Sequence, residues 1–149
     1  MGITIKQATV DDATHIIPLF NAYRMFYGQH SNIGAAGEFI TQRLQNNQSV
    51  IFIAFNTDGK AVGFTQLYPI YSSVGLKNAW LLNDLFVTEA ERGKRIATML
   101  LDAAKLHGRQ TNSGWLMLQT AITNHAAQKA YEANGWQKDN EYYVYNFNL

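Results

Sequence analysis

Two consecutive polar residues interrupt an apolar run between residues 79 and 87. The run AWLLNDLFV is apolar at seven of nine positions, a pattern typical of a central strand covered on both faces. Asn83 and Asp84 stand in its middle, and successive side chains of a strand point to opposite faces. A buried polar side chain needs a partner. Each of the two therefore either satisfies neighbouring backbone groups or belongs to a functional site, and we favour the site.

Three cations and a glycine follow where the chain is expected to enter a helix. The stretch ERGKRIA, residues 91–97, places Arg92, Lys94 and Arg95 around Gly93. A helix N-terminus offers free N–H groups and a positive dipole end, and glycine lets the backbone approach a ligand. The stretch fits a diphosphate cradle, although an ordinary solvated basic turn would look similar. The phosphate-loop pattern G-x-x-x-x-G-K-S/T and the pattern G-x-G-x-x-G are both absent.

A third group of residues lies in the stretch NHAAQKAYEANGW, residues 124–136. Tyr131 follows Asn124 by seven residues, which places both on one face of a helix two turns apart. Ala127 and Ala130 recur at helical spacing and leave room beside the preceding strand. Taken alone, the pair also fits an N-capping asparagine and a core tyrosine.

Hydrophobic periodicity predicts the elements that carry these residues. Strands are predicted at 3–8, 49–56, 61–71, 79–87, 115–121, 136–138 and 142–148. Helices are predicted after the cap residues 9–12 and at 37–46, 94–109 and 124–133, the last ending in a left-handed cap at Asn134-Gly135. The order βααβββαβαββ predicts an α/β fold with a mixed, twisted central sheet and helices on both faces.

Length and composition restrict the class of protein. The 149 residues are 47% hydrophobic and 15% charged, enough to bury one core, so we expect a single domain over 1–149. Twelve basic residues offset eleven acidic ones, which disfavours a nucleic-acid partner, and a module binding through Arg92, Lys94 and Arg95 is a minor alternative. With no cysteine and four scattered histidines, we expect no metal site.

The sequence also carries expectations about location and assembly. The chain has no apolar run of about 18 residues and no signal-peptide pattern at its start, so we expect a cytoplasmic protein without a membrane partner. The aromatic segment 142–148 has more apolar surface than an edge strand safely exposes. We therefore expect a homodimer that covers it.

Taken together, LNDLFV, RGKRIA and NHAAQKAYEANGW resemble the GCN5-related N-acetyltransferase (GNAT) family over nearly the whole chain. The resemblance implies the GNAT fold and acetyl-CoA as co-substrate, whose pyrophosphate the motif Q/R-x-x-G-x-G/A binds through main-chain N–H groups. Arg95 stands in place of the second glycine of this loop, which leaves the loop conformation open. The implied cofactor-binding residues are Leu85, Phe86, Val87, Arg92, Gly93, Lys94, Arg95, Ile96, Ala97, Thr98, Asn124 and Tyr131.

The resemblance also implies direct transfer of the acetyl group to a primary amine of a small molecule or peptide. Tyr131 matches the family's general acid, which protonates the CoA thiolate, and a backbone N–H within 85–87 would polarise the thioester carbonyl. Asp84 is the nearest acidic candidate to take the amine's proton, directly or through water, or to hold the ammonium. A water relay to backbone carbonyls fits equally well. The expected acceptor pocket is formed by Tyr23, Tyr27, Glu38, Asn83 and Asp84.

The acceptor itself stays open among a polyamine, an amino acid and a lysine side chain. The stretches NDLFV and NAYRMFYGQ look most like the branch of small histone/polyamine and spermidine/spermine acetyltransferases, but polyamine enzymes carry Glu-Asp where this chain has Asn83-Asp84. The alternatives are a GNAT enzyme acting on protein N-termini or aminoglycosides, and a non-catalytic CoA-binding regulatory domain.

Overall fold

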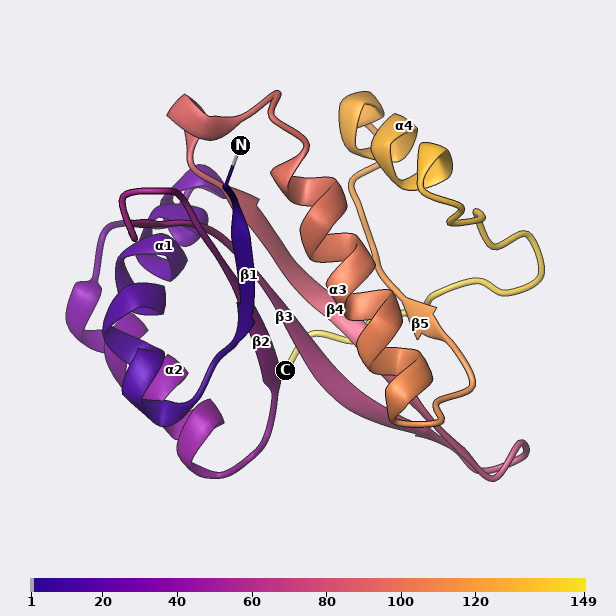
Figure 1. Cartoon of the computed structure of the whole chain (residues 1–149). Coiled ribbons are helices and arrows are strands. Elements are labelled where there is room, and N and C mark those ends of the chain that lie inside the picture. Colours follow the sequence, from indigo (N-terminus) through magenta and orange to yellow (C-terminus); the bar gives the residue numbers. More distant parts are fainter. Residues whose placement is uncertain (1) are drawn as a thin grey trace. The chain divides into compact units, whose positions relative to one another are not determined.

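The structure is a computed structural model that describes residues 2–149, and the chain divides into two compact units. The second unit, Thr120–Leu149, contains α4 (His125–Ala133). The first unit ends at Gln119 and contains the remaining elements (Figure 1), namely β1 (Thr4–Gln7), α1 (Ala13–Phe26), α2 (Ile33–Gln45), β2 (Val50–Phe55), β3 (Ala61–Ser72), β4 (Lys77–Val87), α3 (Ile96–Gln110) and β5 (Leu116–Met117), with short 3-10 helices at Val10–Asp12 and Glu89–Glu91.

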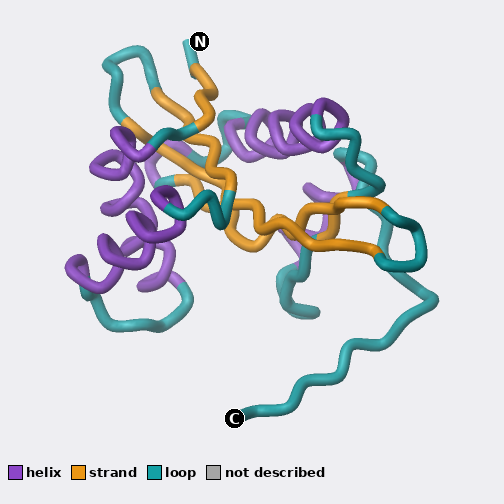
Figure 2. The backbone as a smooth tube through the Cα atoms, turned by 90° about the horizontal axis from the view of Figure 1, so that it is seen from below, coloured by secondary structure: helices purple, strands orange, loops and turns teal. Residues whose placement is uncertain are grey.

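The first unit is built on a mixed sheet of five strands in the order β1-β2-β3-β4-β5. Neighbouring strands are antiparallel except β4 and β5, which are parallel. In both Figure 1 and Figure 2, α1 and α2 lie on one face of this sheet and α3 lies on the other. The predicted fold class, a mixed α/β sheet with helices on both faces, is confirmed.

Strand alternation divides the buried side chains of this sheet between two cores. Ile51, Ile53 and Phe64 belong to the cluster formed with α1 and α2, and all three are fully buried. Phe52, one residue along β2, faces the other way, and its ring lies 5.7 Å from that of His107 on α3. Each such large apolar side chain contributes about 1.5–3 kcal/mol through burial.

Some element boundaries differ from the predicted ones. Helix α2 begins at Ile33 rather than near residue 37, because the Asn32 side chain accepts a hydrogen bond from the Ala35 N–H (3.0 Å) and caps the helix earlier. The strand predicted at 115–121 is reduced to Leu116–Met117. None of the helices between residues 2 and 149 is long and apolar enough to cross a membrane.

The two strands predicted at 136–138 and 142–148 are wrong for this structure. After α4 the chain runs to Leu149 without a helix or strand (Figure 2), and its aromatic side chains are largely exposed, with Tyr143 90% and Tyr145 91% accessible. Alternation shows that a segment could present one apolar face. A strand also needs a neighbour to bond with, and sequence periodicity does not supply one.

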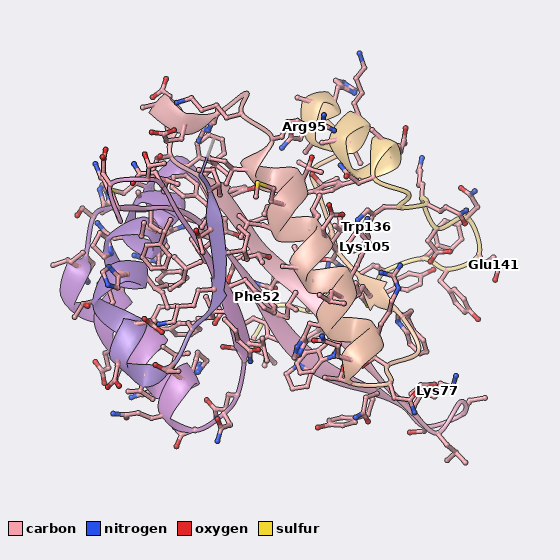
Figure 3. All side chains as sticks on the ribbon, in the orientation of Figure 1. Phe52, Lys77, Arg95, Lys105, Trp136 and Glu141 are labelled. Carbon is pink, nitrogen blue, oxygen red and sulfur yellow. The ribbon has the colours of Figure 1, made fainter. Side chains whose placement is uncertain are left out.

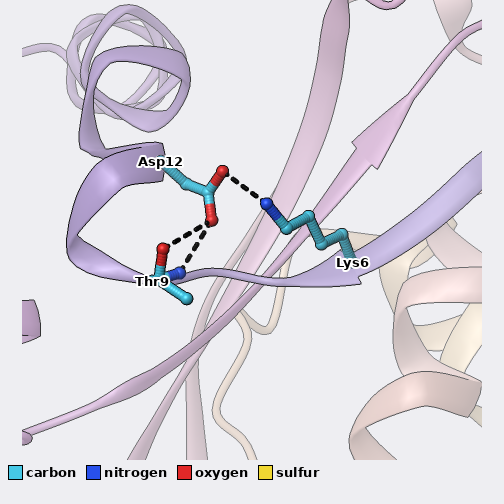
Figure 4. A network of polar contacts seen from close by, with 3 residues as sticks. All are labelled: Lys6, Thr9 and Asp12. Atoms are coloured by element: carbon cyan, nitrogen blue, oxygen red, sulfur yellow. Dashed lines mark hydrogen bonds and ion pairs between the residues drawn. The ribbon is translucent and has the colours of Figure 1, made fainter.

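The buried carboxylate of Asp12 ties β1 to the start of α1 (Figure 4). Its Oδ1 accepts a hydrogen bond from Lys6 Nζ (2.8 Å), and its Oδ2 accepts from the Thr9 main-chain N–H (2.8 Å) and the Thr9 hydroxyl (3.2 Å). Asp12 is 6% exposed, whereas the Lys6 side chain is 51% exposed. The hydrogen bond from Lys6, followed by that from the Thr9 backbone, lowers the pKa of Asp12 below 3.8.

Replacing this carboxylate should weaken the fold in a pH-dependent way. We expect Asp12→Asn to lower the free energy of unfolding at neutral pH by about 1–2 kcal/mol, because an amide accepts these bonds less well and Lys6 is half in solvent. A lowered folded-state pKa contributes stability above the unfolded value of 3.8, and this stability is lost as the pH falls through the folded value. Urea denaturation at neutral and acidic pH measures the difference.

Asp11→Asn is the matched control, since Asp11 lies in the same turn but is exposed. An equal loss of stability in the two variants at neutral pH would contradict the role given to Asp12.

Candidate functional site

The polar pair of β4 lies at a β-bulge. Gln66 of β3 is opposite Asp84, and Leu67 is opposite Leu82, so Asn83 is an extra residue on β4. An extra residue breaks the alternation of side chains along a strand. The prediction that Asn83 and Asp84 point to opposite faces is therefore wrong, because Asn83 Nδ2 donates a hydrogen bond to Asp84 Oδ1 (2.9 Å).

Asp84 is a buried carboxyl group held by donors from two strands and one helix. It is 3% exposed. Gln66 Nε2 donates to its Oδ2, and Tyr23 of α1 also hydrogen-bonds to the side chain. Burial raises the pKa of the Asp84 carboxyl above its usual 3.8, and the bonds from Gln66, Asn83 and Tyr23 offset part of this rise. A carboxylate with a raised pKa is a stronger base than an exposed one.

Aromatic side chains of α1 form one wall beside this carboxyl group. The Tyr23 hydroxyl donates to the Asn83 carbonyl (3.4 Å), and the Tyr23 ring contacts those of Phe64 (5.7 Å) and Tyr27 (5.1 Å). The structure thus brings four of the five predicted acceptor residues into one contact network, from Tyr27 through Tyr23 to Asn83 and Asp84. Glu38, the fifth, is exposed on α2 and accepts a hydrogen bond from Gln42 (3.3 Å).

The bulge also decides which main-chain groups of β4 reach its free edge. The Thr88 N–H donates to the Val62 carbonyl of β3 (2.9 Å). Every second residue of an antiparallel strand bonds to the same neighbour, so Asp84 and Phe86 also turn their main-chain groups toward β3. The main-chain groups of Leu85 and Val87 therefore point to the opposite edge. The ladder between β4 and β5 ends at Leu81, so this edge is beyond the β5 pairing. Leu85 thus directs an N–H donor away from the sheet.

The loop between β4 and α3 keeps a glycine-like backbone without its second glycine. Gly93 has φ +79° and Arg95 has φ 64°, both in the left-handed region, and α3 begins at Ile96. Arg95 lies at the entry to the helix (Figure 3). The first hydrogen bond of α3 runs from the Met99 N–H to the Arg95 carbonyl (3.1 Å), so the N–H groups of Ile96 and Ala97 have no partner within the helix. They are available to a ligand together with the positive end of the dipole. Arg95 therefore adopts the backbone region that a glycine at this position would favour.

The three cations of this loop are used differently. Arg92 Nε donates to the Val87 carbonyl (3.0 Å), and its guanidinium lies 5.1 Å from the Phe26 ring centre. Lys94 forms an ion pair with Glu91 (2.8 Å). Arg95 is the cation whose side chain makes no hydrogen bond or ion pair within residues 2–149. Arg95, Lys94 and Thr98 line a cavity of about 450 Å³, which Gly2, Ile3, Met99 and Asp102 complete.

The second unit carries the two remaining predicted residues. Asn124 caps α4, because its Oδ1 accepts from the Ala127 N–H (3.2 Å). Tyr131 lies two turns later, is partly buried, and its ring lies 6.3 Å from that of Trp136. The helix ends with Gly135 at φ +86°, and the Trp136 N–H donates to the Tyr131 carbonyl (3.0 Å), so the predicted left-handed cap is confirmed.

Sequence reasoning missed three residues around Asp84, namely Ser49, Gln66 and Tyr68. Ser49 Oγ donates to Gln66 Oε1 (2.7 Å), and both residues are buried. Burial, with the charge of Asp84 as a second cause, raises the pKa of Tyr68 to about 12. The available signal was Gln66 itself, a polar residue within the apolar run of the strand at 61–71, as Asn83 and Asp84 are in theirs.

Known proteins resemble this chain over most of its length. The model of the Acetyltransferase (GNAT) family matches residues 16–136. An uncharacterized N-acetyltransferase of Bacillus subtilis (strain 168), YhfO, is 44% identical over 147 residues, covering 99% of this chain and 98% of the relative. The crystal structure of a probable acetyltransferase is 37% identical with a TM-score of 0.94, covering 98% of this chain and 97% of that one. The aminoglycoside N-acetyltransferase AAC(6')-Iy, solved with CoA, is 21% identical with a TM-score of 0.80, covering 99% and 95%, and shows the fold alone.

The left-handed conformation of Arg95 predicts a stabilising substitution. We expect Arg95→Gly to raise the free energy of unfolding by up to about 1 kcal/mol, because a side chain at φ 64° costs about 1–2 kcal/mol and the greater flexibility of unfolded glycine removes part of the gain. Thermal or urea denaturation measures the change. Lys94→Gly is the control, since Lys94 has no positive φ and should only lose stability. A loss of stability in both variants would refute this account.

Proposed function

Because the chain belongs to the GNAT family of acetyltransferases, we propose that it transfers the acetyl group of acetyl-CoA to a primary amine of a small molecule or peptide. The observation that carries this proposal is the buried carboxyl group of Asp84, which lies beside Tyr23 and next to the main-chain N–H of Leu85. A polyamine, an amino acid and a lysine side chain are the candidate acceptors. Protein N-termini and aminoglycosides are the alternatives, the latter because AAC(6')-Iy shares the fold.

On the cofactor side, this chain offers main-chain donors in two places. The N–H of Leu85 points to the free edge of β4, where it can polarise a thioester carbonyl. The N–H groups of Ile96 and Ala97 open α3 and suit a pyrophosphate. Gly93 has no Cβ to project into the open space beside the loop, so a ligand can approach the backbone there. The side chain of Phe86 is buried in the core cluster that α1 and α2 form with the sheet.

On the acceptor side, Asp84 would accept the proton that the bound ammonium must lose before its nitrogen can attack the acetyl carbonyl carbon. A lysine-like amine with a pKa near 10.4 loses its proton at a cost of about 4.6 kcal/mol at neutral pH, and an α-amino group near 8 at a cost of about 1.4 kcal/mol. Burial raises the pKa of Asp84, which narrows the gap between base and amine. The transfer can be direct or pass through one water molecule.

We further propose that the two units act as one acetyltransferase domain. As the C–S bond breaks, the departing thiolate takes a proton from the Tyr131 hydroxyl. With unperturbed pKa values near 8.5 for a thiol and 10 for tyrosine, this transfer costs about 2 kcal/mol, which one well-placed hydrogen bond can offset. Asn124 would contact the pantetheine arm with the part of its side chain that does not cap α4.

Replacing the two proposed proton carriers should have separable effects. We expect Asp84→Asn to lower kcat/KM for the amine by about 100-fold or more, and to remove the rise of kcat/KM with pH that deprotonation of Asp84 causes in the wild type. Tyr131→Phe should lower kcat by a similar factor with little change in KM for acetyl-CoA. A thiol-release assay over a panel of amines and pH values measures both.

Tyr71→Phe is the control, because Tyr71 is 74% exposed at the end of β3. Unchanged rates for Tyr131→Phe at every pH would exclude Tyr131 as the acid. Binding of acetyl-CoA without turnover of any amine would instead favour a non-catalytic regulatory domain.

The exposed tail supports the proposal of a homodimer. Tyr142, Tyr143, Tyr145 and Phe147 are between 78% and 91% exposed, more apolar surface than isolated chains commonly show. We expect light scattering to find twice the chain mass of 16.8 kDa, and Tyr143→Ser with Tyr145→Ser to shift the protein toward the single chain. Tyr71→Ser is the matched control. A wild-type species of one chain mass would contradict the dimer.

A further inference from the structure

A chain of buried polar side chains runs from the start of β2 to the carboxyl group of Asp84. Ser49 Oγ donates to Gln66 Oε1 (2.7 Å), and Gln66 Nε2 donates to Asp84 Oδ2. Their exposed fractions are 8% for Ser49, 0% for Gln66 and 3% for Asp84. Water therefore has little access to these bonds, so the three side chains depend on protein groups for their hydrogen-bond partners.

The order of donors in this chain matters for the charge on Asp84. An amide side chain has one oxygen that accepts and one nitrogen that donates. Ser49 occupies the oxygen of Gln66, which leaves the nitrogen end directed at Asp84. A donor aimed at a carboxyl group favours its charged form, whereas burial favours the neutral form. Gln66 thus opposes the desolvation that would otherwise keep Asp84 protonated.

Other groups facing Asp84 come from three elements. Asn83 of β4 also donates to its side chain, and Tyr23 of α1 hydrogen-bonds to it. Tyr68 of β3 stays a neutral phenol, because its pKa is raised to about 12, and Arg43 of α2 acts on Tyr68 in the opposite direction. Gln66 is the donor that is itself fully buried and fixed by another buried side chain.

We propose that Gln66 is a positioning residue for the reaction, which holds Asp84 as a hydrogen-bond acceptor at the β4 bulge, and that Ser49 sets the orientation of the Gln66 amide. This inference rests on the proposed role of Asp84 as the base. It adds Ser49, which directly precedes β2, and Gln66 of β3 to the acceptor site, although neither side chain needs to touch the amine.

The test is a titration of Asp84 itself, followed by ¹³C NMR of its carboxyl carbon. We expect Gln66→Met, which keeps the length of the side chain but removes the donor, to raise the titration midpoint by about one to two pH units. Ser49→Ala should raise it by less, because the amide keeps its nitrogen but loses its orientation. The acid limb of the pH profile of kcat/KM should move with the titration midpoint of Asp84 in each variant, while KM for acetyl-CoA stays unchanged.

Thr65→Val is the matched control. Thr65 is fully buried next to Gln66, but its hydroxyl donates to the main-chain carbonyl of Asp84 (2.8 Å) and not to the carboxyl group. Its loss should leave the midpoint near that of the wild type. If Gln66→Met does not fold, the midpoint measured in Ser49→Ala decides the test, because this variant removes a single hydroxyl and should still fold.

Two results would overturn the inference: an unchanged midpoint in both Gln66→Met and Ser49→Ala, or a shifted midpoint with an unmoved acid limb in an active enzyme. Failure of the proposed function looks different. In that case the wild type acetylates no amine, or its acid limb does not follow the titration of Asp84, whatever the variants do to the midpoint.

Discussion

Placing an ionisable carboxyl group in a protein interior costs several kcal/mol unless donors surround it. Asp84 meets this requirement with donors from its own strand, from β3 and from α1, so three elements must reach one point. The register of β3 against β4 places Gln66 opposite Asp84, and the packing of α1 on the sheet brings Tyr23 there. The acceptor site therefore depends on how this one charge is accommodated.

The bulge at Asn83 links this buried group to the edge of the sheet. Before the bulge, Trp80 directs its N–H at the Trp115 carbonyl beside β5 (3.2 Å), and without an extra residue the even-numbered residues would continue to do so. The insertion moves that role to Leu85 and Val87. One additional residue thus both pairs Asn83 with Asp84 and reverses which main-chain donors face outward.

The sequence identified the residues that carry local signals and missed those that depend on long-range pairing. Asn83 and Asp84 stood out as polar residues in an apolar run, and the Gly93 loop and the Asn124 cap follow from local chemistry. Gln66 and Ser49 become relevant only when the register of β2, β3 and β4 is known, because their partners lie 17 and 18 residues away in the chain. The prediction of strands at 136–138 and 142–148 was wrong for the same reason, since strand pairing depends on the whole sheet rather than on the segment alone.

The contacts of Arg92 and Lys94 change how an anion would be attracted to this loop. Its guanidinium is engaged by the Val87 carbonyl and lies over the rings of Phe26 and Phe86, and Lys94 is paired with Glu91. Glu91 offsets the charge of Lys94, so the loop presents a weaker long-range field than three cations in a row suggest. Electrostatic steering would come chiefly from Arg92, Arg95 and the α3 dipole, and at physiological ionic strength it extends only about 8 Å. Capture of a polyanion then depends more on encounter at short range. Its association rate should change only modestly with salt concentration.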